Sequence, residues 1–166
     1  AIGYLSSTSQ ANTTANGFMS TAGGANASSF GASSFASAAN STAIGFEAQS
    51  AGAVSTALGA GSTASGMFAV ALGANSVSSG QFSLAVGHDS IASGASSTAI
   101  GQGPQATANE TTALGNGTIA TGLHSTALGY DSETLGENAV AIGHTSAASA
   151  FGAVALGTSA EAGGEA

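Results

Sequence analysis

From residue 41 to residue 59 the chain reads Ser-Thr-Ala-Ile-Gly-Phe-Glu-Ala-Gln-Ser-Ala-Gly-Ala-Val-Ser-Thr-Ala-Leu-Gly. The opening Ser-Thr-Ala-Ile-Gly returns as Ser-Thr-Ala-Leu-Gly after a step of 14 residues. The same step separates a column of glycines that runs through the sequence: Gly3, Gly17, Gly31, Gly45, Gly59, Gly73, Gly87, Gly101, Gly115, Gly129, Gly143 and Gly157. Such a fixed period predicts a solenoid in which each repeat forms one coil.

Each repeat divides into two halves of seven residues. A second glycine column lies seven residues after the first in most repeats: Gly24, Gly52, Gly66, Gly80, Gly94, Gly122, Gly136 and Gly164. Seven residues suffice for one short strand and one turn, and glycine permits tight turns. In the first strand, Thr42 and Ile44 point to one face, whereas Ser41 and Ala43 point to the other. We therefore predict an all-β solenoid of about twelve coils with two short strands per coil, a rod on the order of 58 Å long.

The first 40 residues keep the glycine register but lose apolar content. Asn16 occupies the place of Ile44, and Ser29-Phe30 replaces Ala-Ile. The ends of solenoids often depart from the repeat because their outer face meets water. We expect one domain over residues 1–166, with irregular or capping coils at 1–40 and regular coils at 41–166. Because the sequence ends within the pattern, we expect it to be part of a longer chain.

The composition excludes several kinds of partner. The 166 residues include 26 glycines, eight acidic residues, no lysine, no arginine and no cysteine, and the formal net charge is −8. Without basic side chains the chain cannot neutralise phosphates, so we exclude nucleic acid and electrostatic docking on anionic lipid. Absence of cysteine excludes disulfides and thiolate chemistry. No apolar run is long enough to predict membrane insertion by these residues.

Two stretches carry a family signature: Asn-Ser-Thr-Ala-Ile-Gly at 40–45 and Asn-Ala-Val-Ala-Ile-Gly at 138–143. They resemble the YadA-like head repeat of trimeric autotransporter adhesins, clearly from residue 40 onward and loosely before it. The resemblance implies a left-handed parallel β-roll, three chains side by side as a homotrimer, and a coiled-coil stalk with an outer-membrane anchor. It also implies a bacterial cell-surface adhesin whose multivalent rod attaches to host cells, extracellular matrix or other cells. The implied partner is a host matrix or cell-surface protein or a glycan, and the anchor belongs to parts of the chain outside this sequence.

Four apolar residues form a candidate trimer seam. Phe68 and Phe82 occupy one column in successive coils, with Val54 one coil earlier and Met67 beside Phe68. A thin coil has an interior too small to bury much, so apolar groups that are left over need another surface. A local surface ridge, or packing at a corner of the coil, is the alternative.

The residue after the first glycine is variable and carries most of the large rings. Phe46, His88, Tyr130 and His144 share this column with Tyr4 and Phe18. We treat the first four as a candidate ligand strip. A turn flank that shields the core is the alternative.

The sequence contains no motif for catalysis, a cofactor or a metal. His88 and His144 lie four coils apart, about 19 Å at the strand spacing, so one chain cannot join them at a zinc ion. Three copies of one histidine, His124 among them, could meet on a threefold axis, although a solvated histidine is the simpler reading. Asp131, Glu133 and Glu137 are close in sequence but lack the repeat of calcium-binding β-rolls. We expect a protein that is not an enzyme and that needs no cofactor.

Two other functions compete with adhesion. An ice-binding solenoid would use a flat array of hydroxyl and methyl groups, and the sequence has a threonine column: Thr42, Thr56, Thr98, Thr112 and Thr126. Apolar residues interrupt this column: Val70, Leu84, Val140 and Val154. A passive structural spacer would show no ligand binding by any coil.

Overall fold

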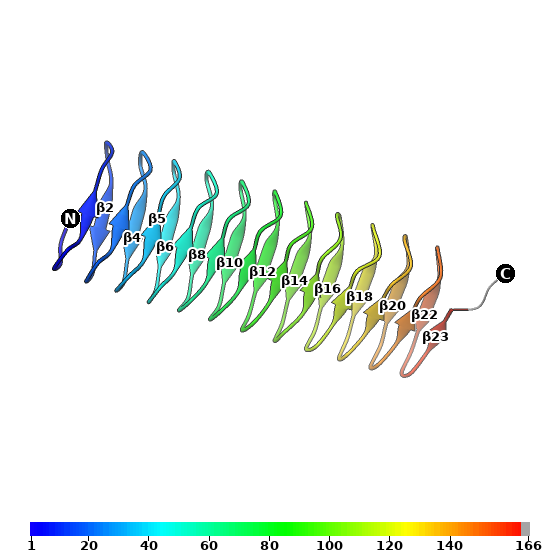
Figure 1. The fold of residues 1–166 in the computed structure, drawn as a ribbon. Helices are drawn as coiled ribbons and strands as arrows, with labels where there is room; N and C mark the ends of the chain where they lie inside the picture. The colour runs from blue at the N-terminus through cyan, green and yellow to red at the C-terminus, as the bar shows by residue number, and fades with distance from the viewer. Residues whose placement is uncertain (164–166) are drawn as a thin grey trace.

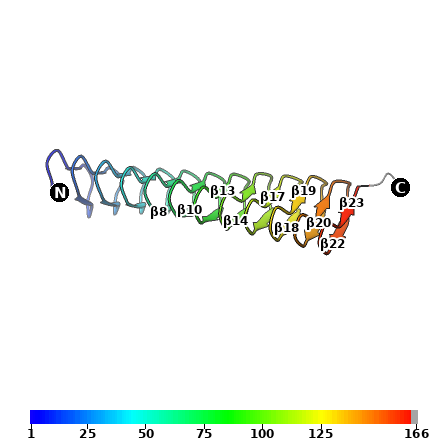
Figure 2. The ribbon, with the colours of Figure 1, turned by 90° about the horizontal axis from the view of Figure 1, so that it is seen from below.

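The computed structural model describes residues 1–163, so Gly164 of the second glycine column lies outside the described residues. Short strands and turns stack into a rod with the N-terminus at one end and the C-terminal side at the other (Figure 1). Figure 2 shows the same row of coils from below. No described residue belongs to a helix that is long and apolar enough to span a membrane.

One sheet collects the first strand of each repeat, and we call it the first sheet. It has 11 strands of three residues in the order in which they occur along the chain. The strands are β2 (Thr14–Asn16), β4 (Ser28–Phe30), β6 (Thr42–Ile44), β8 (Thr56–Leu58), β10 (Val70–Leu72), β12 (Leu84–Val86), β14 (Thr98–Ile100), β16 (Thr112–Leu114), β18 (Thr126–Leu128), β20 (Val140–Ile142) and β22 (Val154–Leu156).

The second sheet collects the second strand of each repeat. It has 12 strands of two residues. The strands are β1 (Ser7–Thr8), β3 (Thr21–Ala22), β5 (Phe35–Ala36), β7 (Gln49–Ser50), β9 (Thr63–Ala64), β11 (Val77–Ser78), β13 (Ile91–Ala92), β15 (Gln105–Ala106), β17 (Ile119–Ala120), β19 (Glu133–Thr134), β21 (Ala147–Ala148) and β23 (Glu161–Ala162).

All strands pair in parallel with the equivalent strands of the coils before and after them. Ala43 lies beside Ala57, which lies beside Ala71, so the pairing register equals the 14-residue repeat. An isolated parallel bridge from Ile2 to Asn16 continues this register toward the N-terminus. The predicted parallel solenoid with two strands per coil is confirmed, with about eleven complete turns.

The interior of the coil holds only small side chains. Ala43, Ala57 and their equivalents are fully buried, and buried serines and threonines lie between them. The Ser55 hydroxyl donates to the carbonyl of Gly52 at 2.6 Å and contacts the Ser50 hydroxyl at 2.6 Å. These contacts satisfy hydroxyl groups that would be costly to bury alone. A larger side chain has no room between two sheets that approach this closely.

The turns use two kinds of backbone geometry. Gly45 has φ of 135°, and a Cβ atom added there would lie 2.5 Å from the carbonyl oxygen of Gly59 in the next coil. Only glycine allows that approach. Two residues later Glu47 is left-handed, with φ of 56°, and seven residues after that Val54 is left-handed as well, with φ of 58°. The left-handed positions therefore alternate between the two ends of the flat coil.

Candidate assembly and ligand surfaces

The coil has two turn edges on opposite sides. The first turn edge consists of the two residues after each first-column glycine, such as Phe46 and Glu47, and it connects β6 to β7. The second turn edge consists of the two residues seven positions later, such as Ala53 and Val54, and it connects β7 to β8. The candidate ligand strip therefore lies on the first turn edge, and the candidate trimer seam lies on the second.

The structure brings part of the candidate seam together. The rings of Phe68 and Phe82 stack with centroids 5.0 Å apart and an interplanar angle of 3°. Both rings are exposed, as are Val54 and Met67. Val54, Phe68 and Phe82 have φ of 58°, 59° and 58°, a left-handed conformation that is uncommon for such residues. The same conformation recurs at the equivalent position of other coils, as at Asn40 and Ser96, so it belongs to the repeat and does not by itself mark the seam.

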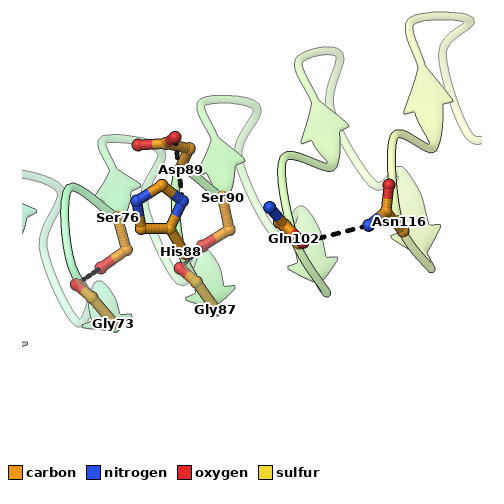
Figure 3. A network of polar contacts seen from close by, with 8 residues as sticks. All are labelled: Gly73, Ser76, Gly87, His88, Asp89, Ser90, Gln102 and Asn116. Atoms are coloured by element: carbon orange, nitrogen blue, oxygen red, sulfur yellow. Dashed lines mark hydrogen bonds and ion pairs between the residues drawn. The ribbon is translucent and has the colours of Figure 1, made fainter.

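The structure divides the candidate ligand strip into separate groups. Tyr130 and His144 stack with ring centroids 5.1 Å apart, and both project into solvent. Phe46 and His88 are separated by two coils that carry alanine at this position. His88 instead pairs its Nδ1 with the carboxylate of Asp89 at 2.9 Å (Figure 3).

Polar side chains continue the first turn edge between His88 and Tyr130. The side-chain amide of Asn116 donates to Gln102 Oε1 at 3.2 Å, across one coil boundary (Figure 3). Behind the edge, Ser76 and Ser90 donate to the carbonyls of the glycines three residues earlier, at 2.9 and 3.0 Å. These serines stabilise the turn from inside the coil, so the side chain on the first turn edge can differ from one repeat to the next.

The titratable groups are scattered over different surfaces. Asp131 lies on the first turn edge, Glu133 lies on the outer face of β19, and Glu137 lies on the second turn edge, so this trio does not converge. His124 faces Glu110 of the preceding coil at 3.8 Å. Within residues 1–163, no three His, Cys, Asp or Glu side chains are grouped so that they could hold a metal ion.

An apolar column on the outer face of the first sheet was not identified from the sequence as a surface. Ala43 turns into the coil, so Ile44 turns outward and remains 38% exposed. Its equivalents continue through nine successive coils: Ile44, Leu58, Leu72, Val86, Ile100, Leu114, Leu128, Ile142 and Leu156. The sequence signal that could have revealed it is the alternation of a small residue with a large apolar one in each first strand, because only the small residue fits inside the coil. A contiguous apolar surface of this length is typical of a protein interface.

An asparagine ladder on the second turn edge was also not identified. The Asn12 amide donates to Asn26 Oδ1 at 3.1 Å, and the Asn26 amide donates to Asn40 Oδ1 at 3.2 Å. All three residues are left-handed, a conformation that asparagine tolerates better than most residues. The sequence signal that could have revealed the ladder is asparagine at the same position of three successive repeats.

Comparison with known proteins identifies the family. The YadA head domain repeat matches residues 22–48, 52–76, 78–103, 106–132, 120–146 and 135–160, which is more than half of the chain. A structural match to the crystal structure of the collagen-binding domain of the Yersinia adhesin YadA has a TM-score of 0.43 and 23% sequence identity, and covers 92% of this chain and 70% of that one. None of the curated proteins matches the chain. The heads of this family are non-enzymatic adhesins, and this chain belongs to the YadA head repeat family.

Proposed function

We propose that this chain forms the head of a trimeric rod that attaches bacteria to host cells, extracellular matrix or other cells. Membership of the YadA head family supports the adhesive role. The trimeric assembly is inferred from the apolar column on the outer face of the first sheet. It carries Ile, Leu or Val in nine successive coils, of which six are exposed and three, Leu72, Val86 and Ile100, are half-buried.

The apolar column favours an arrangement with the first sheet turned inward. Three flat rods around one axis can each direct this face toward the axis. Leu58 is 44% exposed and Leu128 is 38% exposed, and burying the remainder of such a side chain contributes about 1 kcal/mol. Added over the side chains of the column in three copies, this burial would stabilise a trimer by more free energy than one isolated surface contact does. The seam of Val54, Met67, Phe68 and Phe82 would then lie where neighbouring copies meet.

We propose that the trimer binds its ligand through repeated weak contacts. Three copies raise the effective concentration of each site, so a modest affinity per contact suffices. The strip of Phe46, His88, Tyr130 and His144 is one candidate surface, and the outer face of the second sheet is the other. Display on the bacterial surface follows for this chain if it shares the anchoring of its family.

Sedimentation combined with a binding assay tests the proposal. The wild-type rod is expected to sediment as a trimer and to bind at least one member of a panel of immobilised matrix proteins that includes collagen. Leu128→Asp places a charge in the apolar column, on the face of the first sheet that is turned toward the trimer axis. It is expected to give monomers with greatly reduced binding. The control Thr63→Asp places the same charge on the outer face of β9 and is expected to remain a trimer. A stable wild-type monomer would contradict the proposal.

The ice-binding alternative uses the same surface as the proposed trimer. Thr98, Thr112 and Thr126 lie in register on the outward face of three successive strands, so a short regular hydroxyl array exists. That face is also the one that carries Ile100 and Leu114, and a trimer would bury it. Thermal hysteresis by a monomeric rod would favour ice binding, and a trimer without hysteresis would remove it. A rod that binds none of the panel would favour a passive spacer.

A further inference from the structure

Two neighbouring coils of the first turn edge differ from the others in their polar groups. Gln102 and Asn116 are the only side-chain amides at the first position of this edge. Each is followed by a left-handed glycine, Gly103 with φ of 68° and Gly117 with φ of 66°. Nowhere else on this edge do two successive coils both carry glycine at the left-handed position. The amides and the glycines therefore mark one place on the rod.

Behind these two coils the chain also departs from the repeat. Pro104 and Thr118, both buried, occupy the place that Ser90 has in its own coil. The Thr118 hydroxyl donates at 2.7 Å to the carbonyl of Gly129, to which Ser132 would donate if it followed the pattern of Ser90. The buried Ser132 hydroxyl has no hydrogen-bond partner within residues 1–163, which lowers stability. Departures that cost stability gather at functional sites, so these coils are candidates for a binding site.

The backbone of this part of the edge is already paired from coil to coil. Gly103 N donates to His88 O at 2.9 Å. Gly117 N donates to Gln102 O at 3.0 Å, and the ladder continues into the next coil. A peptide that binds by adding a strand needs free backbone groups, so these coils do not suit it. Recognition here depends on side chains.

The side chains keep hydrogen-bonding groups for a ligand. The Asn116 amide donates to Gln102 Oε1 at 3.2 Å, which uses one donor and one acceptor of the pair (Figure 3). The amide nitrogen of Gln102 and the carbonyl oxygen of Asn116 belong to exposed side chains and remain for other contacts. The pair therefore offers a donor and an acceptor that are held at fixed positions.

The two glycines leave open space between two carboxylates. A Cβ atom added at Gly103 would have nothing within 4 Å. At Gly117 the corresponding space is taken by the carboxylate of Asp131, which leans back across the coil boundary. Asp89 occupies the same position one repeat before Gly103, and its carboxylate pairs with His88 Nδ1 at 2.9 Å. An exposed carboxylate thus lies on either side of the open space.

An aromatic ring lies at the C-terminal end of this region. Tyr130 follows Asn116 by one repeat and is 51% exposed. One face of its ring stacks on His144, so the other face is turned toward the coil of Asn116. Such a ring presents an apolar face for packing and a hydroxyl group for hydrogen bonding.

The ligand that these groups fit is uncharged and rich in hydroxyl groups. Amides and carboxylates pair with hydroxyl groups, and an aromatic face packs on the C–H face of a sugar ring. The two carboxylates, with no lysine or arginine in the chain, repel an anionic ligand. Asp89 and Asp131 lie three coils apart, about 14 Å, which leaves room for a short chain of sugar rings.

We propose that this region binds a neutral oligosaccharide, and we call it the polar platform: Asp89, Gln102, Gly103, Asn116, Tyr130 and Asp131. The inference rests on the adhesive function proposed above and names the chemical class of the ligand. The platform lies within one chain, on a turn edge and not on the sheet face that the proposed trimer turns inward. It is shallow and exposed, so a single contact is weak and three copies add avidity.

Binding to immobilised oligosaccharides tests the proposal. The array carries neutral oligosaccharides of glucose, galactose, mannose and N-acetylglucosamine, with sialylated oligosaccharides and polylysine for comparison. The wild-type rod is expected to bind at least one neutral oligosaccharide and none of the sialylated ones. Binding to polylysine alone would show that the carboxylates recognise a cationic partner, and it would overturn the proposal.

Filling the open space tests the place of binding. Gly103→Asn adds a side chain there, and asparagine tolerates the left-handed backbone. The dissociation constant for the bound oligosaccharide is expected to rise at least tenfold. The matched control is Gly152→Asn on the second turn edge, where φ is 65° and an added Cβ again has nothing within 4 Å. The control is expected to leave the constant unchanged.

A second pair of variants tests the aromatic end. Tyr130→Ala is expected to raise the same dissociation constant about tenfold, as loss of an aromatic contact residue does. Tyr4→Ala is the control, because Tyr4 is exposed on the same edge and stacks on Phe18, but lies far from the platform. Both variants are expected to sediment like the wild type.

The outcomes separate the platform from the adhesive function. A rod that binds matrix proteins but no neutral oligosaccharide overturns the platform and leaves adhesion intact. Equal binding by Gly103→Asn and Gly152→Asn also overturns the platform. Dissociation of the trimer by Gly103→Asn does so as well, because it would show that this edge contacts another copy. A rod that binds neither matrix proteins nor oligosaccharides overturns both proposals.

Discussion

Replacing Gly45 by alanine is expected to disrupt the stack of coils. The new Cβ would lie 2.5 Å from the Gly59 carbonyl oxygen and 2.6 Å from its carbon, where ordinary contacts begin at 3.4 Å. The two coils would have to separate by about 1 Å, since the obstacle is backbone and not a flexible side chain. The matched control is Gly103→Ala, where φ is 68° and no atom lies within 4 Å of the added Cβ.

The structure gives the size of the difference. Gly45 N donates to Phe30 O at 2.8 Å, and Gly59 N donates to Ile44 O at 2.9 Å, so separation weakens ladder bonds of about 1 kcal/mol each. Alanine at φ of 135° adds about 1–3 kcal/mol of backbone strain. Gly45→Ala should therefore lower the free energy of unfolding by about 4 kcal/mol or more. Gly103→Ala should cost only about 1–2 kcal/mol for its left-handed conformation.

Urea unfolding followed by circular dichroism measures both variants. All samples need the same protomer concentration, because association adds to the apparent stability. A smaller slope for Gly45→Ala would indicate that the coils around the substitution have already opened in the native state. Equal losses for Gly45→Ala and Gly103→Ala would refute the reasoning, since only Gly45 combines a φ of 135° with the close approach of the next coil.

Four further outcomes are expected. Asn26→Ala should lower the free energy of unfolding by about 0.5–1 kcal/mol more than Asn138→Ala, because both residues are left-handed but only Asn26 joins the amide ladder. Ala99→Leu should cost about 3 kcal/mol or more by overfilling a fully buried position, and a smaller loss would mean that the interior has spare room. Ser55→Ala should cost about 1–2 kcal/mol and exposed Ser65→Ala close to nothing, both read from urea midpoints. Trypsin should leave the denatured chain at its full mass, because the chain contains neither lysine nor arginine.

The period and the residue sizes made much of the fold predictable. The Gly45 column set the repeat, and its spacing of 14 residues became the pairing register of both sheets. Alternation of Ala43 with Ile44 predicted opposite faces. It did not lead us to recognise that Ile44 faces outward, because in most proteins the larger apolar residue is the buried one.

The candidate site was less predictable. Columns such as those of Phe46 and Val54 can be read from the repeat, but their placement on opposite turn edges required the path of the chain through both sheets. The seam at Phe68 and Phe82 was named from column position alone, and their parallel stacking and left-handed backbone were visible only in the structure. The stacking of Tyr130 on His144 was likewise visible only in the structure, whereas the separation of Phe46 from His88 by two alanine-bearing coils can be read from the sequence.

The sequence by itself determined that this protein is a solenoid of equal coils, since a strict 14-residue period with glycine at fixed positions permits little else. It also led to the prediction that these residues do not bind nucleic acid, since they include no lysine or arginine to neutralise the phosphates. Tertiary structure decided which face of each strand meets solvent, because the interior between the sheets holds small side chains, mainly alanine, serine and threonine, with Pro104 among the largest. It also decided that residues such as Ala60 and Phe68 lie on opposite edges at neighbouring levels, a relation that depends on how the coil closes.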